Sequence, residues 1–246
     1  MALVEYEVRD KLAYITLNRS EKLNAVNLSL FNELVSAFNR YDAEPDAWVA
    51  ILSGRGRAFS AGHDQTEEAS FDVDELFLQV LSLKKPLIIA VQGFCIGMAL
   101  ALAFCTDIRI AAEGAKFGWS TVSWGISSVG GPAFLPHYLP RNFGLEYLLT
   151  GELFDAQDAL RFGMVNRVVP EDKLMPTAEE IAGKILKNAP LAVQGMKEAT
   201  ILGLELPLAQ RLRFSKMVAA RVRDTKDAQE GALAFREKRA PIWSGE

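Results

Sequence analysis

The stretch from Pro86 to Thr106 constrains the fold most, because it contains no charged residue. Its length would suffice for a helix that spans a membrane. However, Gln92, Gly93 and Gly97 interrupt it, and the chain has no second stretch of this kind. A short strand, a turn and a buried helix that begins near Gly97 explain the same pattern. We therefore expect a soluble protein, with an integral membrane protein as the alternative.

Short apolar runs rich in Val and Ile recur along the first half of the chain and predict strands. The predicted strands are Val4–Val8, Ala13–Leu17, Trp48–Ser53, Leu87–Val91 and Ile108–Ala112. Apolar residues from Leu28 to Phe38 instead repeat at spacings of three and four, after Asn27 as an N-cap, which predicts a helix. Strands that alternate with helices indicate an α/β domain with crossover connections.

The last third of the chain differs, because its periodicity is helical and is broken at Pro190 and Pro207. The predicted helices are Thr177–Lys187, Leu191–Leu204, Leu208–Val222 and Asp224–Lys238. We expect residues 1–190 to form the α/β core and residues 191–246 to form a C-terminal helical region of the same domain. The many apolar residues of this region predict self-association, since a closed symmetric oligomer would bury them.

Composition limits the classes of partner. The chain has 27 basic and 31 acidic residues, a formal charge of −4, and only short basic clusters, so nucleic acid is not an expected partner. Cys95 and Cys105 lie outside any CxxC motif and predict buried thiols in a reducing compartment. Met1–Asp10 lacks the basic start and apolar run of a secretory signal. We therefore expect a cytoplasmic protein. The two histidines, His63 and His137, lack clustered ligands and predict no metal site.

Two segments carry the candidate chemistry. Phe59–Asp64 follows a predicted strand, and its small residues would let a ligand approach the backbone closely. An ordinary strand-to-helix turn explains this segment as well. Leu87–Met98 reads as a strand, a turn and the start of a helix, whose free amides stabilise an anion or a developing oxyanion. Its glycines, Gly93 and Gly97, are equally explained by tight packing of the strand against the helix.

With these segments, the whole chain resembles the crotonase (enoyl-CoA hydratase/isomerase) family. Lys22–Ala25 resembles the turn that contacts coenzyme A in that family. Phe59–Asp64 resembles its first oxyanion loop, and Pro86–Asp107 resembles its second oxyanion segment. The other matching motifs are Leu149–Glu152, Asp155–Ala156 and Gly163–Val165 in the middle of the chain and Glu230–Arg239 near its end.

The resemblance implies a fold and a ligand. The fold is an α/β spiral of ββα units with a helical C-terminal trimerisation region, assembled as a homotrimer or a dimer of trimers. The ligand is an acyl-CoA thioester, with coenzyme A as part of the substrate and no permanently bound cofactor. Its carbonyl would lie between the backbone N–H groups of His63 and Met98. The implied contacts to coenzyme A are Lys22, Leu23, Ala25, Ala61, Asp64, Gln65 and Thr66, with Phe235 and Lys238 from a neighbouring subunit.

The sequence departs from the family at the residues that move protons. Family hydratases use two glutamates as acid and base, and these fall on Ala101 and Thr121. The single glutamate of family isomerases, expected at Thr121 or near Val129, is also missing. The resemblance therefore implies an enzyme that stabilises a thioester enolate but lacks both hydratase acids.

Two alternatives to a hydratase-like enzyme stay open. The segment Phe59–Asp64 closely resembles that of methylmalonyl-CoA decarboxylase-like members, which also carry a histidine at the position of His63. Those enzymes place a tyrosine where Ser128 stands, and Ser128 is a weak catalytic candidate. A decarboxylase for malonyl-type thioesters is therefore one alternative, and a protein that binds acyl-CoA without turnover is the other.

Overall fold

The computed structural model describes residues 2–66 and 71–246, and within them a six-stranded sheet has the order β1-β2-β3-β4-β6-β9. β1 and β2 pair antiparallel, and the remaining neighbours pair parallel. The strands are β1 (Val4–Arg9), β2 (Leu12–Leu17), β3 (Val49–Gly54), β4 (Leu87–Val91), β6 (Ile108–Ala112) and β9 (Arg167–Val169). The five strands predicted from the sequence are therefore confirmed, with bounds that differ by at most one residue.

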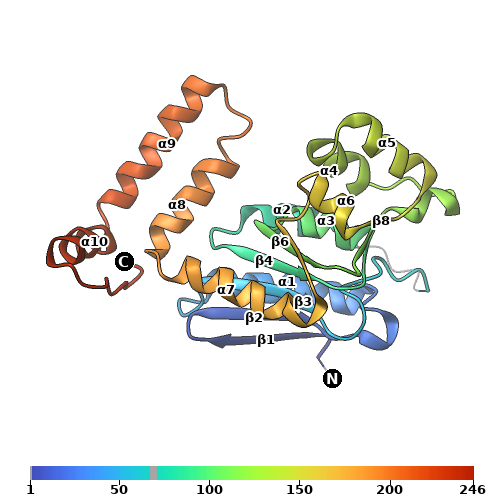
Figure 1. Ribbon diagram of the computed structural model, residues 1–246, viewed down its shortest axis with the longest axis horizontal. Helices are drawn as coiled ribbons and strands as arrows, with labels where there is room; N and C mark the ends of the chain where they lie inside the picture. The colour runs from blue at the N-terminus through green and yellow to red at the C-terminus, as the bar shows by residue number, and fades with distance from the viewer. Residues whose placement is uncertain (1, 67–70) are drawn as a thin grey trace.

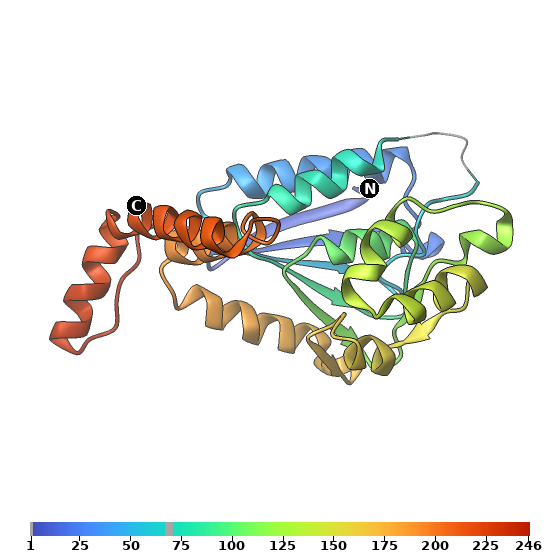
Figure 2. The same ribbon diagram turned by 90° about the horizontal axis from the view of Figure 1, so that it is seen from above.

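Helices cover both faces of this sheet (Figures 1 and 2). Leu87, Ile89 and Val91 of β4 point into a core shared with α1 (Leu28–Ala43) and α2 (Val73–Ser82). The alternate β4 residues join a second core against α7 (Leu174–Leu186) on the opposite face. Because side chains of a strand alternate between faces, a strand buried on both sides appears in the sequence as a continuous apolar run.

The uncharged stretch Pro86–Thr106 forms a strand, a turn and a helix, as predicted. β4 ends at Val91, and α3 (Met98–Phe104) follows a short strand β5 (Phe94–Ile96) that the sequence pattern did not predict. Gly93 makes the turn with a φ of 56°, and a Cβ there would lie 2.0 Å from the carbonyl oxygen of Arg57. Across residues 2–66 and 71–246, no helix is both long and apolar enough to cross a membrane.

The middle of the chain forms short elements beside α3. β5 pairs with β7 (Lys116–Gly118), which pairs with β8 (Phe154–Asp155). A 3₁₀ helix, η2 (Ser120–Trp124), follows β7. It is followed by α4 (Gly130–Tyr138), α5 (Arg141–Thr150) and α6 (Ala156–Arg161).

The four helices predicted for the last third are present with shifted bounds: α7, α8 (Pro190–Ile201), α9 (Leu208–Arg223) and α10 (Lys226–Glu237). The predicted start of α7 at Thr177 is wrong by three residues, because Pro176 sits in the first turn, where proline is tolerated. The predicted break at Pro190 is confirmed, because α7 ends at Leu186; Pro190 itself begins α8, since its fixed φ suits the first helical position. Figure 1 shows α8 and α9 projecting from the sheet, with α10 at the end of the molecule opposite α4 and α5.

Candidate functional site

Main-chain hydrogen bonds bring the two candidate oxyanion segments together. The N–H of Phe59 donates to Gln92 O at 2.7 Å, and the N–H of Ser60 donates to Phe94 O at 2.9 Å. In return, the N–H of Ile96 donates to Ser60 O at 3.2 Å. The loop that follows β3 thus runs beside β5 as a short parallel strand would, and the two segments are fixed relative to each other.

Gly62 lets this loop lie directly against the start of α3. Its φ is +87°, and a Cβ added there would lie 2.6 Å from the carbonyl oxygen of Ile96 and 3.7 Å from the amide nitrogen of Met98. Residues with a side chain are strained at this φ, and the side chain would also collide with backbone. A glycine is therefore required where the first segment meets the second.

The N–H groups of His63 and Met98 adjoin at this meeting point. Val26 bonds to both neighbours of His63: its N–H donates to Gly62 O at 2.7 Å, and its carbonyl accepts from Asp64 N at 2.9 Å. In this parallel bridge both bonds go to the neighbours of His63, so the N–H of His63 itself points away from Val26. Met98 is the first residue of α3, and among the described residues neither N–H has a protein acceptor.

The predicted coenzyme A turn packs on the other side of the loop. The N–H of Ala61 donates to Leu23 O at 2.9 Å, and the hydroxyl of Ser60 donates to Asn24 O at 2.8 Å. Asn24 is fully buried, and its side-chain amide donates to the carbonyls of Arg55 and Ala58. The loop therefore lies between this turn, which contains Lys22 and Ala25, and the start of α3.

Asp64 is buried, and its carboxylate is held within the protein. It forms an ion pair with Arg19, and it accepts hydrogen bonds from the hydroxyl and the N–H of Thr66. The hydrogen bonds from Thr66 and Arg19 lower the pKa of Asp64 well below its usual value. Gln65 and Thr66 are exposed at the surface beside it. Of the residues predicted to contact coenzyme A, Asp64 thus has its side chain already occupied.

Beyond the two N–H groups the surroundings are mostly apolar. The imidazole of His63 stacks on Phe71, with ring centroids 4.8 Å apart, and Phe71 stacks on Phe31. Ala101 lies on α3 and is fully buried. Ser128 uses its hydroxyl to accept a hydrogen bond from the N–H of Gly131 at 3.1 Å, near the start of α4.

Comparison with known proteins decides the family. The sequence profile described as enoyl-CoA hydratase/isomerase matches residues 7–246. The chain belongs to this family, the crotonase family. Its resemblance to crotonases and its predicted fold class are thereby confirmed.

Relatives of this crotonase-family enzyme cover nearly its whole length. The (E)-benzylidenesuccinyl-CoA hydratase of Thauera aromatica is 36% identical over 253 residues, which cover 98% of this chain and 99% of that protein. The carnitinyl-CoA dehydratase of Citrobacter koseri is 35% identical, with 94% of each chain covered. The solved structure of an enoyl-CoA hydratase from Bacillus anthracis superposes with a TM-score of 0.93 at 33% identity, covering 99% of this chain and all of that one.

Two predicted residues of this crotonase-family enzyme lie away from the loop in the single chain. Phe235 is on α10 with 87% of its surface exposed, and Lys238 follows α10 with a φ of +55°. α10 lies at the far end of the molecule from α4 and α5 (Figure 1).

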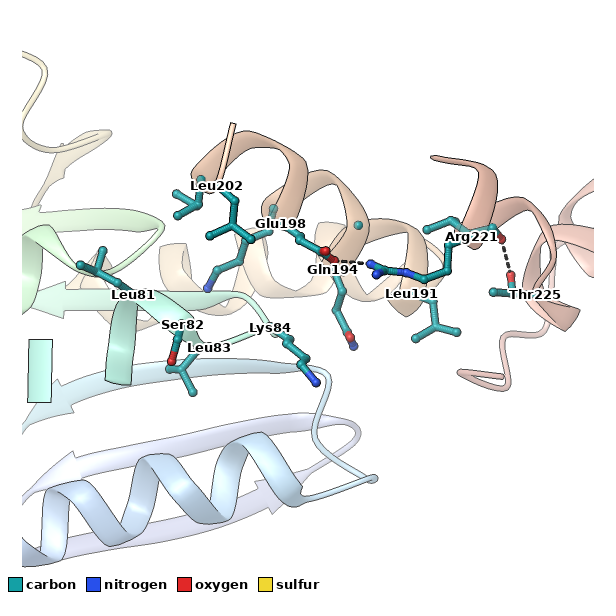
Figure 3. Close-up of a pocket in the computed structure, with 14 residues that line it drawn as sticks. Leu81, Ser82, Leu83, Lys84, Leu191, Gln194, Glu198, Leu202, Arg221 and Thr225 are labelled. Carbon is teal, nitrogen blue, oxygen red and sulfur yellow. Dashed lines mark hydrogen bonds and ion pairs between the residues drawn. The ribbon is translucent and has the colours of Figure 1, made fainter. Parts of the chain in front are cut away.

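A cavity of about 510 Å³ lies between the end of α2 and helices α8 and α9 (Figure 3). Its walls are mainly apolar, with the ion pair of Arg221 and Glu198 on one side. The residues that line it come from Leu81–Lys84, from α8 and the residue after it, and from Arg221, Val222 and Thr225 at the end of α9 and just beyond. No residue of Phe59–Asp64 or of α3 borders it, so it is separate from the meeting point of His63 and Met98.

Sequence reasoning missed three residues that shape the site. Asn24 and Ser60 tie the predicted coenzyme A turn to the loop through buried hydrogen bonds, and Arg19 forms the ion pair with Asp64. Asn24 lies within a motif that the resemblance identified, which was a usable signal. In the described ranges, no three potential metal ligands of the His, Cys, Asp or Glu type come together.

Proposed function

We propose that this enzyme binds an acyl-CoA thioester and holds its carbonyl oxygen between the N–H groups of His63 and Met98. The single observation that carries the proposal is the contact of the two segments at Gly62, which puts both free N–H groups on adjoining backbone. A thioester that becomes an enolate gathers negative charge on this oxygen. Each preorganised donor aimed at such charge is worth roughly 3 kcal/mol in the transition state.

The proposed reaction does not include hydration by the usual pair of glutamates. Ala101 and Thr121 stand at those positions, and neither side chain transfers protons at neutral pH. Asp72 is used as the N-cap of α2 and is exposed. Glu67 and Glu68, which are the next carboxylates to consider, lie outside the described residues. The chemistry that fits is therefore enolate stabilisation without a general acid and base from α3.

Decarboxylation of a malonyl-type thioester is a second candidate. It needs a stabilised enolate and a place for the leaving carboxylate, and it needs less proton transfer than hydration. The observation that favours decarboxylation is the imidazole of His63, which is held by stacking on Phe71. This imidazole belongs to the same residue as one of the two proposed N–H donors. Ser128 stays a weak catalytic candidate, because its hydroxyl accepts from the N–H of Gly131 and keeps its own O–H as a donor. Binding without turnover remains the outcome if neither reaction occurs.

The proposed contacts to coenzyme A follow the order of the chain. Lys22, Leu23 and Ala25 adjoin the loop through its bonds to Leu23 and Asn24. Ala61, Gln65 and Thr66 belong to or follow the loop, and Asp64 would act by holding it in shape. Coenzyme A arrives with the substrate, so we propose no permanently bound cofactor. The buried thiols of Cys95 and Cys105 support a reducing, cytoplasmic compartment.

We also propose a homotrimer or a dimer of trimers, in which Phe235 and Lys238 reach the ligand of a neighbouring subunit. The C-terminal helices expose large apolar side chains, including Met196, Leu208, Leu212 and Met217 at 60% or more. A surface of this kind marks an interface. The cavity in Figure 3 lies beside the same helices. Residues 191–246 stay part of the same domain in this proposal, because Lys197 bonds to Asp107 in the core.

Turnover assays test the reaction. The comparison is hydration of crotonyl-CoA against decarboxylation of methylmalonyl-CoA with one preparation of the enzyme. We expect hydration to be slower than in a family hydratase by several orders of magnitude, because each acid or base contributes about 10²–10⁴-fold. Hydration at the usual rate would overturn the proposal. Turnover of neither substrate, with binding retained, would favour a binding protein.

Titration calorimetry with butyryl-CoA tests binding, and sedimentation tests assembly. Lys238→Glu should weaken butyryl-CoA binding, because a like charge replaces a cation that faces phosphate. Glu237→Lys, the neighbouring exposed position, is the reverse control and should not weaken binding. A monomer at micromolar concentration would contradict both the trimer and the shared contact.

A further inference from the structure

Trp119 packs against α3, the helix that carries Ala101. It directly follows Gly118, whose carbonyl accepts from the N–H of Gly97 at 2.9 Å, so its main chain begins beside the start of α3. Its ring stacks on Phe104 of α3, with centroids 6.1 Å apart and planes 18° apart. Ala101 lies between Gly97 and Phe104 on the same side of the helix, because positions four and seven apart share a face.

α4 closes over both residues. A Cβ built on Gly130 would lie 2.5 Å from the Cβ of Ala101, and one built on Gly131 would lie 3.2 Å from Cγ and Cδ2 of Trp119. Two successive glycines of α4 therefore contact Ala101 and the indole. The Cβ of Ala101 therefore faces Gly130, and the indole lies beside the next residue of α4.

The N–H of this indole is buried without a protein partner. Trp119 is 2% exposed, and within residues 2–66 and 71–246 its Nε1 finds no acceptor. Buried indole N–H groups normally donate a hydrogen bond, and leaving one unmade destabilises the folded protein. Among the described residues, none of the other three tryptophans, Trp48, Trp124 and Trp243, has a buried Nε1 without a hydrogen-bond partner. An acceptor from outside the chain would remove this cost.

We propose that Trp119 Nε1–H donates to an uncharged oxygen on the acyl chain, so that the enzyme prefers 3-oxo- or 3-hydroxyacyl-CoA over unsubstituted acyl-CoA. This rests on the proposed function, in which the thioester lies at His63 and Met98. The indole stacks on the ring of Phe104 and lies beside Gly131, and an unpaired carboxylate would be costly in such a buried place. An indole donates but neither accepts nor releases a proton near neutral pH, so it orients the acyl chain and transfers nothing.

The test compares two ligands of equal chain length, acetoacetyl-CoA and butyryl-CoA, by titration calorimetry. Trp119→Phe keeps an aromatic ring and removes the N–H. We expect this variant to bind acetoacetyl-CoA about fivefold more weakly and to bind butyryl-CoA nearly unchanged, since a fivefold change corresponds to about 1 kcal/mol, the contribution of one hydrogen bond. Trp48→Phe is the control, because the ring of Trp48 makes a cation–π contact with Lys11 away from α3. This variant should alter neither affinity.

A second readout follows the indole N–H itself in ¹⁵N-indole nuclear magnetic resonance spectra, with the Trp119 signal identified by its loss in Trp119→Phe. We expect acetoacetyl-CoA to move this signal downfield and butyryl-CoA to leave it in place. Equal weakening of both ligands in Trp119→Phe, or an unmoved signal, would overturn the proposal and assign the N–H to packing or to an ordered water. If the unaltered enzyme binds neither ligand, the proposed function itself fails.

Discussion

Gly130 and Ala101 lie in direct contact, because a Cβ built on Gly130 would come within 2.5 Å of the Cβ of Ala101. This contact sets the spacing of α3 and α4. The small residue at position 101 is therefore matched by a small residue on the neighbouring helix.

We predict that Gly130→Ala destabilises the enzyme by about 1–3 kcal/mol, the usual cost of an added methyl group in a packed interior. Gly183→Ala is the control, since Gly183 lies within α7 and the described chain offers nothing within 4 Å of its added Cβ. That control should stabilise by up to about 1 kcal/mol, because alanine favours a helix. Urea unfolding measures both, and equal effects would show that the contact is not tight.

A second prediction concerns Gly62. Gly62→Ala should weaken butyryl-CoA binding at least tenfold, because its Cβ would push the loop away from the carbonyl of Ile96 and separate His63 from Met98. Gly163→Ala is the control, since Gly163 also has a positive φ, of 73°, but among the described residues no atom lies within 4 Å of its Cβ. Both variants carry backbone strain of about 1–3 kcal/mol. Calorimetry that finds equal affinities in the two variants would contradict the assignment of the loop.

The third prediction concerns the bond between the C-terminal helices and the core. Lys197 donates to Asp107 at 2.8 Å and to the carbonyl of Lys85 at 3.0 Å, with its side chain 11% exposed. Lys197→Met should lower the free energy of unfolding by about 2 kcal/mol, since hydrogen bonds to charged groups are worth about 1.5–3 kcal/mol. Lys184→Met, which removes an exposed pair with Glu180, should change it by less than about 0.5 kcal/mol. Urea unfolding should separate the two variants, and similar losses would contradict this role.

The fourth prediction concerns acid. The pKa of Asp64 is lower in the folded enzyme than its ordinary value of 3.8, because Thr66 and Arg19 bond to the carboxylate. Its stabilisation is therefore complete above about pH 4 and is lost as the pH falls through the folded pKa. Asp64→Asn should be less stable than the unaltered enzyme at pH 6, and the difference should shrink below pH 4.

Urea unfolding at several pH values measures this difference. The exposed Asp46, which pairs with Lys11 at the surface, provides the matched control as Asp46→Asn. This control should give a much smaller difference at pH 6, because water screens an exposed pair. A pH-independent gap between the unaltered enzyme and Asp64→Asn would contradict the proposed ion pair.

The sequence predicted the parts of the fold whose burial leaves a pattern. The strand Leu87–Val91 is buried on both faces, and a strand of this kind appears in the sequence as an uncharged apolar run. The segment from η2 to α6 was not predicted, because several of its apolar residues face outward. Trp124 is 61% exposed and Val129 is 60% exposed, so no periodicity marks an inner face.

The candidate site divides in the same way. His63 and Met98 followed from the resemblance, since their segments keep a recognisable order of small residues. The partnership of Arg19 with Asp64 and the unpaired N–H of Trp119 did not follow. Both depend on residues that are far apart in the chain but close in the fold, and no local sequence pattern predicts such contacts.

The pairing of Phe59 and Ser60 with Gln92, Phe94 and Ile96 has a consequence for how such an enzyme evolves. These bonds join main-chain atoms, so they do not depend on the side chains of the residues that form them, provided that Gly62 and Gly93 are kept. Substitutions at Ala101 or Thr121 would leave in place the proposed backbone N–H donors for a carbonyl oxygen. A lineage could therefore lose one chemistry and acquire another without passing through an ancestor that fails to hold its substrate.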